Sequence, residues 1–132
     1  AFASGNRIEA LRDALALRLA PLAGRRYVVQ HDALQYFERR FGLSPLGAIS
    51  PAPDAQPGAA RLLSLTRAIA ESQARCIFVQ PQAAQGVAQA LARSSGARVA
   101  TLDDLGASIP PGPDAYDQLL ENVADALVSC LR

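Results

Sequence analysis

The sequence predicts an α/β fold in which a four-stranded parallel sheet carries helices on both faces. Four short apolar or β-branched segments alternate along the 132-residue chain with stretches of helical periodicity. Half of the residues are hydrophobic, which is enough for the core of one domain of this length. Because parallel strands need crossover connections, and these are nearly always right-handed, the alternation favours a doubly wound, three-layer α/β/α arrangement.

Strands are predicted where short runs are rich in apolar or β-branched residues. These runs cover residues 26–30, 46–49, 76–80 and 99–102. The third run, which begins at Cys76, is continuously apolar, as expected for a strand that is buried on both faces of a sheet, and Pro81 ends it.

Helices are predicted where apolar residues recur every three or four positions. They cover about 8–22, 33–41, 59–74, 83–93 and 114–131. Asn6 is a candidate N-cap of the first helix, and Pro21 lies near its end. Gly42 closes the second helix. A loop rich in proline and glycine precedes the third helix, and another precedes the last one.

Charge and hydropathy exclude several classes of partner. Thirteen basic residues, all of them arginine, face twelve acidic residues, so the net charge of +1 gives no field that would attract nucleic acid or an anionic membrane. No apolar run approaches the ~20 residues that a bilayer span needs, so we expect no membrane insertion of this segment. The first residues show neither an initiator methionine nor a secretion signal, and we expect a processed or truncated start.

Polar residues follow three of the predicted strands directly. They are His31, Gln80 and Asp103. In doubly wound sheets, ligands bind outside the carboxyl ends of the strands, where the strand order reverses, so these side chains mark a candidate site. His31 is a potential metal ligand, although a lone histidine is more often a surface residue. Asp103 has the alternative role of capping a turn, and Asp104 is expected to face solvent or cap a turn.

The two cysteines, Cys76 and Cys130, lack the short spacing of a zinc finger or a redox pair. The face of the last helix that carries Leu120 and Leu127 also carries Cys130, which directs it inward, toward the start of the third strand. Buried thiols and a disulfide both remain open at this point. A bridge would stabilise the fold by about 4 kcal/mol and would imply an oxidising compartment.

Motifs of common enzyme classes are missing. The chain has no glycine-rich nucleotide-binding motif and no nucleophile elbow, and its single histidine leaves no histidine-paired nucleophile beyond His31 itself. The proline-rich loop 106–113 is a stiff connection rather than a phosphate cradle, because proline lacks the amide donor that a cradle uses.

At several stretches the sequence resembles the C-terminal lobe of the ZnuA-type periplasmic solute-binding proteins of metal ABC transporters. The matching stretches occur in the same order as in the family and cover 31–43, 47–50, 78–82, 101–106 and 112–116. The most specific of them is the block HDAxxYFxxRFGL, which begins at His31. The resemblance implies a Zn²⁺-binding protein rather than an enzyme. In this family the metal is held in a cleft between two α/β lobes and passed to a membrane permease.

The resemblance also assigns roles to individual residues. It implies that His31 is the histidine ligand of the C-terminal lobe and that Asp103 matches an aspartate ligand of metal-binding relatives. Cys76 and Cys130 match the positions of a disulfide in some Gram-negative members, and a periplasmic location follows. Residues 1–23 correspond to the end of the helix that links the lobes, and residues 24–132 to the metal-binding lobe. Tight Zn²⁺ binding is expected only together with the N-terminal lobe.

Two departures from the family pattern concern the candidate site. Gln80 stands where the family has a glutamate, and Asp104 stands where it has a proline. Two alternative functions remain. One is a manganese- or iron-binding relative on the same scaffold, which the imidazole of His31 disfavours because harder ions prefer oxygen ligands. The other is a small flavodoxin-like enzyme that uses His31 and Asp103 as acid and base.

Overall fold

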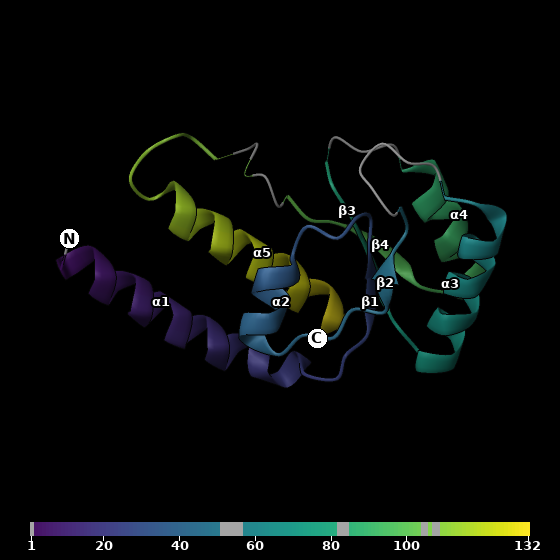
Figure 1. The fold of residues 1–132 in the computed structure, drawn as a ribbon, viewed down its shortest axis with the longest axis horizontal. Helices are drawn as coiled ribbons and strands as arrows, with labels where there is room; N and C mark the ends of the chain where they lie inside the picture. Colours follow the sequence, from purple (N-terminus) through teal and green to yellow (C-terminus); the bar gives the residue numbers. More distant parts are fainter. Residues whose placement is uncertain (1, 51–56, 82–84, 104–105, 107–108) are drawn as a thin grey trace.

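The computed structural model describes residues 2–50, 57–81, 85–103, 106 and 109–132 (Figure 1). Its elements, in chain order, are α1 (Phe2–Leu19), the 3₁₀ helix η1 (Ala20–Leu22), β1 (Tyr27–Val29), α2 (Gln35–Phe41), β2 (Gly47–Ala48), α3 (Ala59–Ser72), β3 (Cys76–Val79), α4 (Gly86–Ser95), β4 (Arg98–Thr101) and α5 (Ala115–Leu131). No helix in the described ranges is long and apolar enough to span a membrane.

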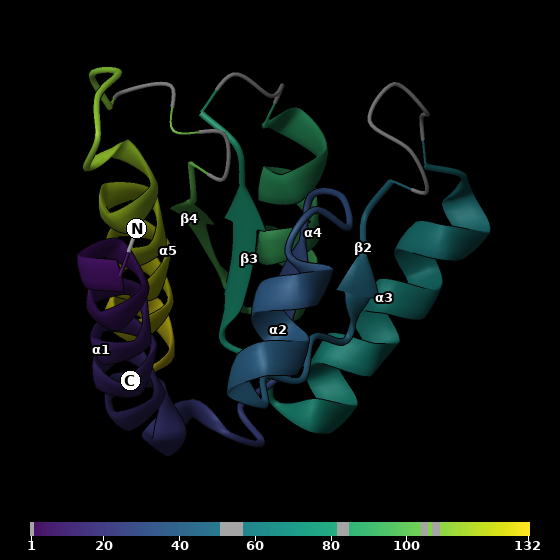
Figure 2. The same cartoon turned by 60° about the vertical axis from the view of Figure 1, so that its left-hand side comes forward.

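The four strands form one parallel sheet in the order β2-β1-β3-β4, which confirms the predicted fold class. On the central strand β1, Val28 is paired with Gly47 of β2 on one side and with Ile77 of β3 on the other. The chain moves outward from β1 to β2, crosses back to β3 and continues to β4, so the strand order reverses between β1 and β3. Figure 2 shows the strands pointing toward one edge of the sheet.

Helices cover both faces of the sheet, as the alternation of elements predicts (Figure 1). Tyr27 and Val29 pack into a core with α1 and α5 on one face, and the partly buried apolar residues of α2 join it. Val28 and Ile77 face the other way, into a second core with α3 and α4. Because successive side chains of a strand point to opposite faces, three consecutive apolar residues in β1 supply both cores.

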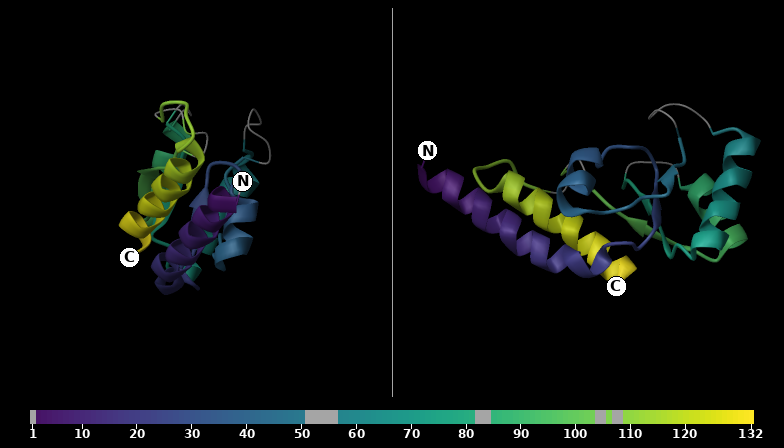
Figure 3. Two further views of the ribbon diagram at one scale, coloured as in Figure 1. Left: turned by 90° about the vertical axis from the view of Figure 1, so that its left-hand side faces the viewer. Right: turned by 60° about the horizontal axis from the view of Figure 1, so that its bottom comes forward.

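The first helix runs along the last one (Figure 3). Leu15 and Leu19 are buried in the core that α5 shares, and the Arg18 guanidinium lies 2.7 Å from the Asp125 carboxylate. The prediction of Asn6 as the N-cap is wrong, because α1 begins at Phe2 and Asn6 lies within it. The pairing of Arg7 with two aspartates next to the start of α5 keeps this part of α1 against its neighbour.

Other boundaries shift by a few residues. The second helix begins at Gln35 rather than at 33, because the Ala33 amide donates to the His31 carbonyl in a tight turn. The fourth helix is Gly86–Ser95 instead of 83–93, and residues 83 and 84 lie outside the described ranges. The last strand, Arg98–Thr101, begins and ends one residue earlier than predicted.

Cys76 and Cys130 form a disulfide, which resolves the choice between thiols and a bridge. It joins the first residue of β3 to the last turn of α5. Arg98 and Arg25 donate to the carbonyls of Cys130 and Leu131 at the same helix end. These arginines occupy carbonyls that have no partner within the helix itself.

Candidate metal site

His31 lies in the turn that connects β1 to α2, which we call the His31 turn (residues 30–34). The turn begins at the carboxyl end of β1, where the Gln30 amide donates to the Phe78 carbonyl and the Ser50 amide donates to the Gln30 carbonyl. Both neighbouring strands therefore hold the start of the turn. His31 is half-buried, and it sits at the edge between β1 and β3, where the strand order reverses.

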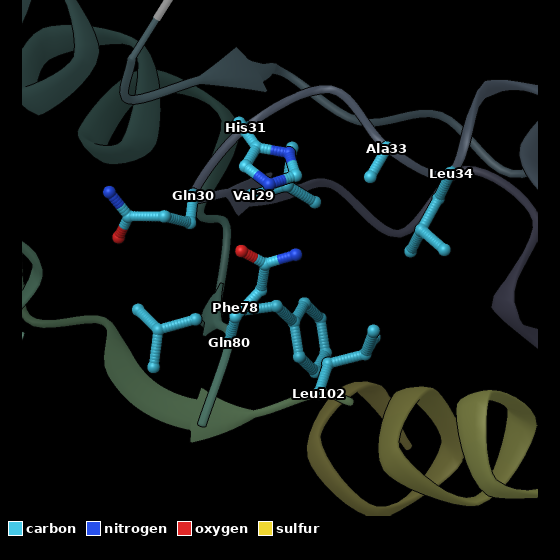
Figure 4. Close-up of a pocket in the computed structure, with 9 residues that line it drawn as sticks. Val29, Gln30, His31, Ala33, Leu34, Phe78, Gln80 and Leu102 are labelled. Atoms are coloured by element: carbon cyan, nitrogen blue, oxygen red, sulfur yellow. The ribbon is translucent and has the colours of Figure 1, made fainter. Parts of the chain in front are cut away.

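A small hollow lies beside His31, which we call the rim hollow. Its walls come from the His31 turn, from the ends of β1 and β3 and from the residue after β4: Val29, Gln30, His31, Ala33, Leu34, Phe78, Val79, Gln80 and Leu102. Figure 4 shows the Gln80 carboxamide pointing toward the His31 ring, whereas the Gln30 side chain points away. The hollow encloses about 20 Å³, enough for one water-sized guest and far below the volume of an organic-ligand pocket.

The structure brings the strand-end residues to one edge of the sheet, in part as predicted. His31 and Gln80 line the same hollow. Asp103 is half-buried and does not line the hollow, but it directly follows Leu102, which does. The Leu102 amide donates to the Val79 carbonyl, so the chain stays paired with β3 up to the residue before Asp103. Asp104 lies outside the described residues.

The disulfide is not part of this site. Cys76 is the first residue of β3, whereas Gln80 follows its last residue, so the strand separates the disulfide from the hollow. The side chain of Asp32, next to His31, accepts a hydrogen bond of 2.6 Å from the Gln35 amide group at the start of α2. This exposed hydrogen bond links the His31 turn to the first residue of α2.

A buried hydrogen bond joins the strand before the His31 turn to the helix after it, and the sequence patterns did not predict this bond. The Tyr27 hydroxyl donates to the Glu38 carboxylate over 2.5 Å, and both side chains are buried. Burial raises the pKa of Glu38, and the Asp32 carboxylate adds to this, while the Tyr27 hydrogen bond acts in the opposite direction. Burial, with Glu38 close by, also raises the pKa of Tyr27. One sequence signal could have indicated that Glu38 is buried. Its spacing from Leu34 and Phe41 places it on the apolar face of the helix.

The donors in this lobe are too few for a complete site. Within the described ranges, no group of three or more histidine, cysteine, aspartate and glutamate side chains could hold a metal ion. Protein-bound zinc usually has four ligands, of which catalytic sites take three from side chains. The geometry therefore offers the His31 imidazole at the end of β1 and the Asp103 carboxylate two strands away, after β4.

Comparison with known proteins decides the family. The family described as zinc-uptake complex component A, periplasmic (ZnuA), matches residues 2–130. The chain belongs to the ZnuA family. The resemblance seen in the sequence is thereby confirmed, and the family is one of metal-binding uptake components, not of enzymes.

Individual relatives agree with this assignment. The chain is 39% identical to the high-affinity zinc uptake system protein ZnuA of Brucella abortus over 98% of its own length. The laminin-binding protein Lmb of Streptococcus agalactiae, described as having adhesin and metal transporting activity, superposes with a TM-score of 0.83 at 30% identity over 96% of this chain. A Zn(II)-bound variant of AdcAII from Streptococcus pneumoniae gives 0.80 at 25% identity over 96% of this chain.

The chain spans less than half of the length of these proteins. It covers 39% of the Brucella protein, 48% of Lmb and 46% of AdcAII. The fold described above is thus similar to one part of each of these proteins.

Proposed function

We propose that this chain is the C-terminal lobe of a periplasmic solute-binding protein, which captures Zn²⁺ between two lobes and delivers it to an ABC permease. The observation that carries the proposal is the position of His31, half-buried at the carboxyl edge of the sheet where the strand order reverses. This is the place where open α/β sheets bind ligands. Membership in the ZnuA family and the zinc-related names of its members support the choice of metal.

The donor chemistry suits zinc as the transported ion. A neutral imidazole is a good ligand for Zn²⁺, with a bond of about 2.0–2.1 Å, and a carboxylate such as that of Asp103 can add an oxygen or an outer contact. An imidazole is less suited to Mn²⁺, which prefers oxygen ligands. Gln80, whose carboxamide points toward His31, is a weaker ligand than a carboxylate and can orient the ring instead.

The small volume of the rim hollow favours half of a metal site over an enzyme pocket. The rim hollow encloses about 20 Å³, too little for an organic substrate of the flavodoxin-like alternative. Because this lobe supplies one histidine, the remaining zinc ligands would come from an N-terminal lobe of the same protein. Residues 1–23 would then form the end of the helix that links the lobes, anchored here by the packing of α1 on α5. The disulfide fits a periplasmic location.

Substitution of His31 tests the proposal. In the full-length, two-lobed protein, His31→Ala is expected to weaken Zn²⁺ binding about 100-fold or more in calorimetry, because a ligand of the metal is lost. Gln89→Ala, an exposed position on α4, is the matched control and should leave the dissociation constant unchanged. If His31→Ala bound Zn²⁺ with unchanged affinity, His31 would not be a metal ligand, and the proposed function would be overturned.

Two further measurements address the finer assignments. Asp103→Asn should weaken Zn²⁺ binding less than His31→Ala does if its carboxylate makes an outer contact, and comparably if it binds the metal directly. Competition between Zn²⁺ and Mn²⁺ separates the zinc protein from a manganese-binding relative. Preference for Mn²⁺ would assign the lobe to the alternative.

A further inference from the structure

We propose that Tyr27 and Glu38 form a positioning pair for the metal ligand His31, acting through the His31 turn. The inference rests on the proposed function, because it gives the pair a role in metal binding. It goes beyond that function in naming two buried residues, neither of which lines the rim hollow, that determine how tightly this lobe holds the metal.

The pair connects the two elements between which the His31 turn lies. Tyr27 is the first residue of β1 and is fully buried. Glu38 lies in the middle of α2 and is 5% exposed to solvent. The 2.5 Å hydrogen bond between them spans eleven residues of sequence and encloses the whole turn. The sheet holds the start of the turn through Gln30, and the Tyr27–Glu38 bond holds the helix that follows it.

The helix α2 is short, and most of its other contacts with the fold are apolar. The helix has only seven residues, and no side chain caps its N-terminus. Its aromatic residues Phe37 and Phe41 are partly buried against the core, with ring centroids 4.8 Å apart. A hydrogen bond between two buried groups requires a specific distance and direction, and it therefore selects one placement of the helix where apolar contacts tolerate several.

The tyrosine of this pair also contacts a residue that lines the rim hollow. The Tyr27 ring packs edge-on against Phe78, with centroids 5.6 Å apart and planes at 80°. Phe78 lines the hollow directly, and Leu34, at the end of the His31 turn, lines it from the helix side. A shift of α2 would therefore move Leu34, at the helix end of the turn, relative to Phe78, which stays in the sheet.

A purely structural role for the pair makes different predictions. If the hydrogen bond only stabilised the fold, its loss would lower the unfolding temperature and leave the affinity of the folded protein for zinc unchanged. If it positions His31, its loss must weaken zinc binding in protein that is still folded, and the effect must depend on the presence of His31. Groups that orient metal ligands typically change metal affinity by about 10–100-fold.

Three variants of the full-length protein separate these cases. Glu38→Leu removes the acceptor without leaving a buried charge, Glu38→Gln keeps an acceptor for the Tyr27 hydroxyl, and Tyr27→Phe keeps the ring against Phe78 but loses the donor. We expect Glu38→Leu and Tyr27→Phe to weaken Zn²⁺ binding about 10-fold, and Glu38→Gln to remain within about twofold of the parent protein. The visible spectrum of the Co²⁺-loaded protein should change in the first two variants and not in the third, because it reports the ligand geometry.

A double-mutant cycle decides whether the effect passes through His31. In a His31→Ala background, Glu38→Leu should produce no further loss of affinity, because the residue that it positions is gone. An equal loss in both backgrounds, or an unchanged affinity in the folded variants, would overturn the inference. Should Glu38→Leu fail to fold, Tyr27→Phe carries the same comparison. If His31→Ala itself binds zinc normally, the proposed function fails, and this outcome is distinct from a failure of the positioning role.

Discussion

The disulfide between Cys76 and Cys130 ties the first residue of the buried strand β3 to the last turn of α5, with the two Cα atoms 6.2 Å apart. Arg98 donates to the Cys130 carbonyl at the same point, so a covalent bond and a hydrogen bond both hold this helix end to the sheet. The junction lies at the end of β3 remote from the rim hollow.

Removing the disulfide should destabilise the lobe without altering the site. The variant Cys76→Ala/Cys130→Ala is expected to lose about 4 kcal/mol of unfolding free energy, because the bridge restricts the unfolded chain over a separation of 54 residues. Urea unfolding of the variant and of the unreduced parent measures the difference.

Mass spectrometry of the unreduced parent should find two hydrogen atoms fewer than in the dithiol form. Free thiols in the parent would contradict the prediction.

The stability of the lobe should depend on the protonation of Glu38. Its raised pKa means that the folded state binds the proton more tightly than the unfolded chain does. Stability from this group is therefore complete below the ordinary glutamate pKa of about 4.3 and falls as the pH rises through the folded-state value. Glu38→Gln removes the titration and keeps the hydrogen-bond acceptor.

Urea unfolding across this pH range provides the measurement. Relative to Glu38→Gln, the parent protein should lose stability as the pH rises above the ordinary glutamate pKa of about 4.3. Parallel stability profiles, or a parent protein that gains on the variant as the pH rises, would show that the carboxyl pKa is not raised in the folded state.

Gly42 should be required at the end of α2. Its φ of +68° lies in the left-handed region, and its amide donates to the Glu38 carbonyl. Although an added Cβ would meet no atom within 4 Å, Gly42→Ala should cost about 1 kcal/mol, because the backbone conformation itself is unfavourable for alanine.

Gly86 offers a matched control for that substitution. It begins α4, has no positive φ, and an added Cβ there would also meet nothing within 4 Å. Gly86→Ala should leave the stability unchanged or raise it by up to about 1 kcal/mol. Equal losses in the two variants, measured by thermal unfolding, would argue against backbone conformation as the cause at Gly42.

Arg98 should stabilise the end of α5. Its guanidinium donates to the Cys130 carbonyl over 2.9 Å, and a cation at a helix C-terminus also interacts favourably with the helix dipole. Arg98→Ala is expected to cost about 1 kcal/mol in denaturant unfolding. Arg67→Ala, an exposed position on α3, is the comparison and should change little. A loss of the same size at Arg67 would mean that the effect is not specific to the helix end.

Sequence patterns predicted the two central strands, β1 and β3, because both faces of these strands are buried and require apolar side chains. The runs around Val28 and Ile77 are apolar at every position, and the structure buries them between two cores. Boundaries were less accessible. At the start of α1, Asn6 matched a local capping signal, but the helix begins at Phe2 and contains it.

The candidate site was predictable in part for a similar reason. His31 and Gln80 follow strands directly, so any parallel sheet brings them to one edge, and both line the rim hollow. The order of the strands cannot be obtained from local sequence patterns. It places Asp103 after β4, one strand beyond Gln80 and two strands from His31. The Tyr27–Glu38 bond was inaccessible because it joins two elements whose separation in space the sequence pattern does not give.

The edge strand β2 shows how the lobe limits unwanted association. The guanidinium of Arg61, on α3, donates to the Ala48 carbonyl through two nitrogen atoms, at 2.6 and 3.1 Å. An extended segment from another molecule that added itself beside β2 would need this carbonyl as an acceptor and would have to displace a charged donor to reach it. A single side chain thus discourages sheet growth and aggregation along this border of the molecule.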